Sequence, residues 1–142
     1  MIQSSYHMKN TKLRISCILI AFESYKDKGS SVFHCVQALL NQDFKDFELI
    51  IVNNGRQGKI KNKDLKDFVL SQGRVMEKGH DIIFKIINNK MPQNLNHARN
   101  MGAKIAQSEL LVFVEDDTIL CDNKAFSKIY KSFKSHKRLS RV

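Results

Sequence analysis

Four short apolar runs are spread along the chain, at residues 15–22, 47–52, 82–87 and 110–114. Continuous apolar runs of this length are typical of strands that are buried on both faces of a parallel sheet. The segments between the runs repeat apolar residues at helical spacing, which predicts helices at residues 32–40, 65–76, 95–106 and 123–134. The pattern therefore predicts strands that alternate with helices.

Strands alternating with helices form right-handed crossover units. The expected fold class is α/β, with a doubly wound, mainly parallel sheet covered on both faces. The chain has 142 residues, which is enough for one domain with a core of its own. We expect that domain to begin at residue 13 and residues 1–12 to be a poorly ordered N-terminus.

Each predicted strand is followed by polar side chains. They are Glu23, Asn53 with Asn54, Asn88 with Asn89, and the triplet Glu115, Asp116 and Asp117. The carboxyl ends of parallel strands lie along one edge of the sheet, where ligands of such folds bind. We therefore expect the carboxylates and the amides to line one crevice.

The acidic triplet has two interpretations. Three adjacent carboxylates repel one another, and hard oxygens of this kind suit Mg²⁺ or Mn²⁺, which bind through one or two carboxylates and the phosphates of a substrate. Alternatively, the triplet is a solvated loop after an edge strand, and spacing alone favours this simpler interpretation.

Charge is distributed unevenly along the chain. The net charge is +10, and residues 123–142 hold seven basic residues and no acid. Such a segment is placed to meet phosphates, anionic lipid or nucleic acid, although a lysine-rich helix face is more often simply solvated. No zinc spacing, aromatic strand motif or helix-turn-helix is visible, so we expect no nucleic-acid partner.

The three cysteines, Cys17, Cys35 and Cys121, form no close pair. This argues against a disulfide framework or a zinc site and favours a reducing, cytoplasmic location.

No run of residues is long enough to span a bilayer. Residues 15–22 follow basic residues as in a signal peptide, but Ser16 interrupts the run and a small-x-small cleavage site is missing.

Several stretches resemble the nucleotide-binding half of family 2 glycosyltransferases. They are residues 15–19, 39–55, 98–102 and 113–117, in matching order and spacing. The resemblance implies a GT-A, Rossmann-like fold that binds a nucleotide-diphosphate sugar with Mn²⁺ or Mg²⁺. It further implies transfer of the sugar to an acceptor hydroxyl on a glycan, a lipid carrier or a protein, in glycan biosynthesis.

The resemblance also assigns roles to single residues. Phe22 matches the aromatic residue that packs on the nucleobase, and Asn54 stands where an acid often bonds the base. Asp116 matches the carboxylate near the ribose, and Asp117 the metal ligand of an Asp-x-Asp-like motif, so both are candidate metal-site residues. Arg99 is either a phosphate partner or a surface arginine paired with an acid.

Family members continue past the acidic motif into a half that binds acceptor. The resemblance thus covers a GT-A domain that is truncated before the acceptor half, and the catalytic base stays unknown. The competing hypothesis is an inactive donor-binding remnant that acts only in binding. Such a half is expected to leave apolar side chains uncovered around Phe126, Ile129, Tyr130 and Phe133.

A third hypothesis is a phospho-acceptor signalling domain of similar topology. Such a domain has an acidic pair after the first strand and a phosphorylated aspartate after the third. Here those strand ends carry Glu23 and Asn88, so this hypothesis is disfavoured.

Overall fold

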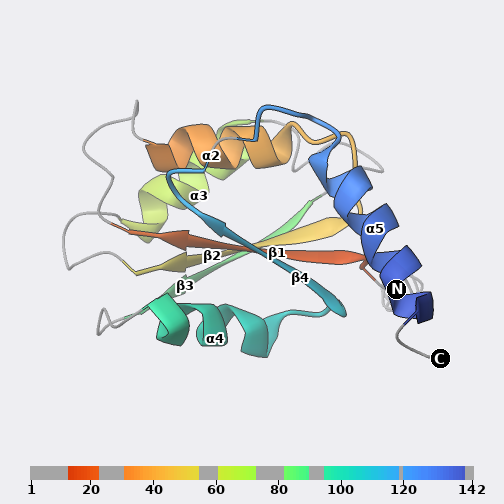
Figure 1. The fold of residues 1–142 in the computed structure, drawn as a ribbon. Coiled ribbons are helices and arrows are strands. Elements are labelled where there is room, and N and C mark those ends of the chain that lie inside the picture. The colour runs from red at the N-terminus through yellow and green to blue at the C-terminus, as the bar shows by residue number, and fades with distance from the viewer. Residues whose placement is uncertain are drawn as a thin grey trace, which may run out of the picture.

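The computed structural model describes residues 13–22, 31–54, 61–72, 82–89, 95–118 and 120–139. They form one sheet of four parallel strands in the order β3-β2-β1-β4 (Figure 1). The strands are β1 (Ile15–Ala21), β2 (Phe47–Asn53), β3 (Ile83–Asn88) and β4 (Leu110–Glu115). The predicted α/β parallel architecture is confirmed. The predicted disordered segment 1–12 lies outside the described residues.

Four helices cover the sheet, with α2 and α3 on one face and α4 on the other (Figure 1). They are α2 (Ser31–Leu40), α3 (Asn62–Ser71), α4 (Leu95–Ile105) and α5 (Ala125–Leu139). Helix α3 begins three residues before its predicted start and ends at Ser71, two residues before Gly73. Helix α5 continues past residue 134. In both helices the extra turn holds polar residues, which form helix without adding to an apolar pattern.

Two hydrophobic layers flank the central strands, since β1 and β2 are buried along their whole length. The larger layer faces α2, α3 and α5, and the smaller one packs α4 against Ile18, Ile20, Ile50 and Val52. Gly102 allows this close packing, because a Cβ atom there would lie 2.5 Å from Ile18 Cγ2. Side chains of β1 and β2 thus make the close approach at Gly102.

The strand that precedes the acidic triplet is an edge strand. Helix α4 lies over β1 and β2, and Phe113 of β4 remains 43% exposed. The apolar run at residues 110–114 had predicted a buried strand, and this prediction is wrong. An apolar run does not distinguish a central strand from an edge strand, because the distinction depends on which strands pair.

Helix α5 is fixed to the corner between α2 and β2. Phe126 is buried edge-to-face against Phe47, with ring centroids 4.9 Å apart. The side chain of Gln42 accepts a hydrogen bond from Phe126 N at 3.1 Å and donates one to Asp122 O at 2.9 Å. The expected apolar exposure is wrong for Phe126, which is covered, whereas Ile129 is 36% exposed and Tyr130 and Phe133 are half-buried.

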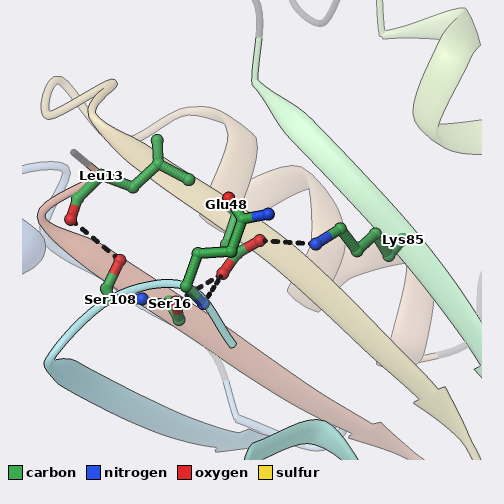
Figure 2. A network of polar contacts seen from close by, with 6 residues as sticks. Leu13, Ser16, Glu48, Lys85 and Ser108 are labelled. Atoms are coloured by element: carbon green, nitrogen blue, oxygen red, sulfur yellow. Dashed lines mark hydrogen bonds and ion pairs between the residues drawn. The ribbon is translucent and has the colours of Figure 1, made fainter. Parts of the chain in front are cut away.

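A polar network lies at the other end of the sheet from the acidic triplet, at the start of the strands (Figure 2). Its centre is the fully buried Glu48, whose Oε1 accepts hydrogen bonds from Ser16 Oγ at 2.6 Å and Gln107 N at 2.7 Å. The other oxygen, Oε2, pairs with Lys85 Nζ at 3.3 Å. These bonds connect β1, β2, β3 and the segment between α4 and β4.

Candidate nucleotide and metal site

The carboxyl ends of the four strands lie level along one edge of the sheet (Figure 1). Ala21 of β1 pairs with Asn53 of β2, and Asn53 in turn with Asn88 of β3. On the other side, Ile20 pairs with Glu115 at the end of β4. The polar residues that follow the strands therefore share one edge, as the sequence predicted for a crevice in this type of fold.

Asp116 is held in place by the end of the first strand. The backbone N–H of Phe22 donates a hydrogen bond to Asp116 Oδ2 at 2.8 Å, and the Asp116 side chain is only 5% exposed. The chain turns here, with Thr118 N bonded to Glu115 O at 2.9 Å. Because a buried carboxylate needs hydrogen-bond donors, Phe22 fixes where Asp116 points. Two predicted site residues, far apart in sequence, are thus in direct contact.

The other two acids of the triplet are exposed and differ in their surroundings. Glu115 pairs with Arg99 of α4, with Nη2 and Oε1 3.2 Å apart and both side chains partly exposed. Exposed pairs of this kind contribute only about 0.2–1 kcal/mol, so a phosphate is able to displace Glu115 from Arg99. Asp117 lies next to the fixed Asp116 and faces solvent.

Whether Asp116 and Asp117 suit a divalent cation depends on the side chains that lie around them. Within the described residues, no group of three His, Cys, Asp or Glu side chains converges on one point. Mg²⁺ and Mn²⁺ do not require such a group, since they are commonly bound by one or two carboxylates together with phosphate oxygens and water. The exposed Asp117 beside the immobilised Asp116 fits a cation of this type, with the remaining ligands supplied by a nucleotide.

A cysteine beneath the acidic triplet was not recognised in the sequence. The buried Cys35 of α2 donates its thiol to Glu115 O at 3.7 Å. Burial, together with the smaller effect of the charges of Asp116 and Asp117, raises the pKa of Cys35 to about 12. Cys35 therefore stays a neutral thiol, and it acts as neither a thiolate nucleophile nor a thiolate metal ligand.

Amide side chains lie along the same edge of the sheet, at the ends of β2 and β3. Asn89 Nδ2 donates to Asn54 Oδ1 at 2.7 Å, and both residues are buried. Asn53 Nδ2 donates to Asn62 Oδ1 at 2.7 Å, which connects the end of β2 to the start of α3. Asn54 and Asn89 were both predicted at this edge, whereas Asn62 and the two hydrogen bonds were not, because a hydrogen bond between different loops leaves no sequence pattern.

Other candidates are less informative. His34 and His97 lie on helices with exposed side chains, as expected for residues without a catalytic role. Glu23 and the segments 24–30, 55–60 and 90–94 lie outside the described residues.

Comparison with known proteins identifies the family. The sequence profile of glycosyl transferase family 2 matches residues 16–139. The chain belongs to glycosyl transferase family 2. No curated protein matches it.

Solved structures of S. aureus TarS share the fold of this family 2 chain. TarS 1-349 superposes with a TM-score of 0.66 at 16% identity, over 87% of this chain and 33% of that one. A longer TarS structure gives 0.64 at 18% identity, over 87% and 20%. TarS 1-349 in complex with UDP gives 0.62 at 20% identity, over 87% and 32%. The family 2 chain thus spans about a third or less of these structures.

Proposed function

We propose that residues 13–142 form the donor-binding part of a glycosyltransferase of glycan biosynthesis, which binds a nucleotide-diphosphate sugar together with Mn²⁺ or Mg²⁺. The observation that supports this best is the contact between Phe22 N and Asp116 Oδ2, with Asp117 exposed beside it. It places a backbone-oriented carboxylate and a solvent-facing one together at the ligand-binding edge of a parallel sheet.

The proposed donor site has a base end and a phosphate end. Phe22 packs on the nucleobase, Asn54 bonds its edge, and Asp116 accepts a hydrogen bond from the ribose. The amide of Asn54 both donates and accepts, unlike a carboxylate, so it presents a different pattern to the base. The TarS structure in complex with UDP supports a nucleoside diphosphate as the ligand.

At the phosphate end, Asp117 and Asp116 would hold the cation, and Arg99 would exchange Glu115 for a phosphate oxygen. The cation supplies charge neutralisation of the departing diphosphate. Arg99 adds a second positive charge, which α4 holds at this edge beside Glu115. Together these residues stabilise the leaving group, which makes attack by an acceptor hydroxyl easier.

Calorimetry with UDP, with and without Mn²⁺, tests the metal assignment. In the Asp117→Asn variant, nucleotide binding is expected to lose its dependence on the cation, whereas melting temperature stays unchanged because Asp117 is exposed. The matched control is Asp67→Asn, which removes an exposed carboxylate on α3, far along the chain from the triplet. Cation-dependent binding that survives in Asp117→Asn at full strength would refute the assignment.

The alternative is a donor-binding remnant without transferase activity. Asp116 and Asp117 are assigned to donor and cation, and Glu115 is engaged by Arg99 until a phosphate replaces it, so no described carboxylate at this edge has been assigned to accept the acceptor's proton. General base catalysis contributes about 10²–10⁴-fold to rate, so we expect no transfer by these 142 residues alone. Acceptor-dependent release of nucleoside diphosphate from a panel of nucleotide sugars would contradict this.

The acceptor and the cellular location extend the same proposal. An acceptor hydroxyl on a glycan, a lipid carrier or a protein fits the proposed transfer reaction equally well.

No described helix is long and apolar enough to cross a membrane. We propose a cytoplasmic protein that associates peripherally with membranes through the basic C-terminal segment.

A further inference from the structure

One side of α5, together with the residue before β1, forms a basic surface. We define the basic surface by five side chains: Arg14, Lys124, Lys128, Lys131 and Lys134. The four lysines are exposed and recur every three or four residues, which places them along one side of the helix. Among the side chains that the structure describes, Ser127 and Ser135 also lie on this side, and Ser127 Oγ donates to Asp43 Oδ1 at 3.0 Å, so one acid borders the cations there.

The way α5 is attached decides where the basic surface points. Phe126 and Tyr130 pack inward, against Phe47 and Phe44 respectively. Gln42 fixes the first turn of the helix through Phe126 N. A helix held in this way presents its other sides to solvent. The lysines are therefore displayed on a rigid element that already has its core contacts.

The basic surface holds more positive charges than the acids beside it neutralise. The Arg14 guanidinium and the Lys134 ammonium lie 5.5 and 5.6 Å from the same Tyr130 ring centroid. Asp46 pairs with Arg14, and Asp122 pairs with Lys128. For Lys131 and Lys134, the described part of the chain supplies no ion pair. Two cations held at one ring, with an acid beside only one of them, favour an external anion.

We propose that the basic surface docks the protein onto a bilayer that contains anionic phospholipids. Lysine is a flexible point charge that suits a diffuse negative plane, whereas planar recognition of single phosphates favours arginine, and four of the five groups are lysines. Nucleic-acid binding normally adds exposed aromatic or amide side chains that stack on or read bases. The basic surface has none, because Tyr130 is half-buried between its two cations.

The position of α5 also gives the bound protein an orientation. Its partners Phe47 and Arg14 lie at the starts of β2 and β1, whereas Asp116 follows the end of β4, so the basic surface and the candidate site occupy opposite ends of the sheet (Figure 1). A strand of this length spans about 20 Å. The docked protein would hold its donor site away from the bilayer, toward acceptors that project from the membrane or arrive from solution. This last step rests on the proposed function.

Sedimentation with vesicles tests the docking. One set of vesicles is phosphatidylcholine alone, and in the other about a third of the lipid is phosphatidylserine. We expect binding to the anionic set only, weakened by added salt. Each lysine near such a surface contributes about fivefold to partitioning, so the triple variant Lys124→Gln, Lys131→Gln, Lys134→Gln is expected to bind on the order of 100-fold more weakly.

The matched control is Lys61→Gln, Lys66→Gln, Lys104→Gln, which removes the same charge from exposed lysines on or beside α3 and α4. An equal loss in this control would overturn the proposal, because net charge rather than the basic surface would then explain binding. Equal binding to neutral vesicles, or tighter binding to single-stranded RNA than to anionic vesicles at the same salt, would also overturn it. UDP binding by the triple variant should stay unchanged, and Asp117→Asn should still bind vesicles, so failure of one proposal is distinguishable from failure of the other.

Discussion

Two buried carboxylates lie at opposite ends of the same sheet, and their surroundings differ. Glu48 is fully buried and receives a serine hydroxyl, a backbone N–H and a lysine. Asp116 is nearly as buried, its immediate neighbour Asp117 is exposed, and its contact with Phe22 is made by the backbone. Glu48 pairs with Lys85, and Asp116 stands between two further acids, Glu115 and Asp117.

This difference indicates that the two ends of the sheet have different roles. A buried carboxylate with a full set of donors and a paired cation connects elements, and its removal is costly because its partners lose their acceptor. A buried carboxylate beside an exposed acid concentrates negative charge at the ligand-binding edge, and concentrated negative charge attracts a cation. We infer that the end with Glu48 maintains the fold and that the end with Asp116 binds the ligand.

The largest expected effect is a loss of stability when Glu48 is replaced. Glu48→Ala leaves Lys85, Ser16 and Gln107 N without their shared acceptor, so the free energy of unfolding should fall by about 3–5 kcal/mol in urea denaturation. At a urea concentration where the variant is still folded, UDP affinity should be unchanged. Asp116→Asn is the comparison variant, since its amide oxygen still accepts from Phe22 N, and it should lose affinity instead of stability. Reversed results in the two variants would contradict the division of roles.

A smaller effect is expected at the ligand end from Phe22→Ala. The backbone N–H that holds Asp116 is kept, so only the ring is removed. Affinity for UDP should weaken by about 1–3 kcal/mol, the range for stacking of a base on an aromatic side chain. Because Phe22 is half-buried against the α4 layer, thermal melting must be measured as well. Lost stability with unchanged affinity would make Phe22 a core residue.

The smallest expected effect concerns the pair of Arg99 and Glu115. If Arg99 must leave Glu115 to bind phosphate, Glu115→Gln should strengthen UDP binding by about 0.2–1 kcal/mol, the value of an exposed ion pair. The gain should shrink as salt is added. Weaker binding in Glu115→Gln would show that the pair positions Arg99 for the ligand.

The fold could be predicted from the sequence because its signals are local. Apolar runs such as residues 15–22 and helical spacing such as that of residues 32–40 identified every strand and helix to within a few residues. Sheet order is a long-range property, so the sequence left the edge position of β4 as one of two alternatives and did not predict the exposure of Phe113. The burial of Phe126 was missed for the same reason, since it depends on Gln42 and Phe47 from a distant segment.

The candidate site could be predicted only in part. The sequence identified Asp116 and Phe22 separately, and the structure adds the hydrogen bond between them. Asn89 was expected at this edge, but its bond to Asn54 and the position of Cys35 were missed, because an amide pair across two strands and a thiol under a turn have no spacing to detect. The roles of these residues toward a nucleotide remain predictions that the variants above test.

The edge position of β4 has a consequence for motion. Amide hydrogens of the central strands β1 and β2 should exchange with solvent only through global unfolding, whereas β4, paired on one side to β1, should exchange through cheaper local opening. The amides Asn53 and Asn54 follow the central β2, and the acidic triplet follows β4. The base side of the site is therefore attached to the slowest-exchanging part of the protein, and its metal side to a strand that is able to shift as diphosphate enters and leaves.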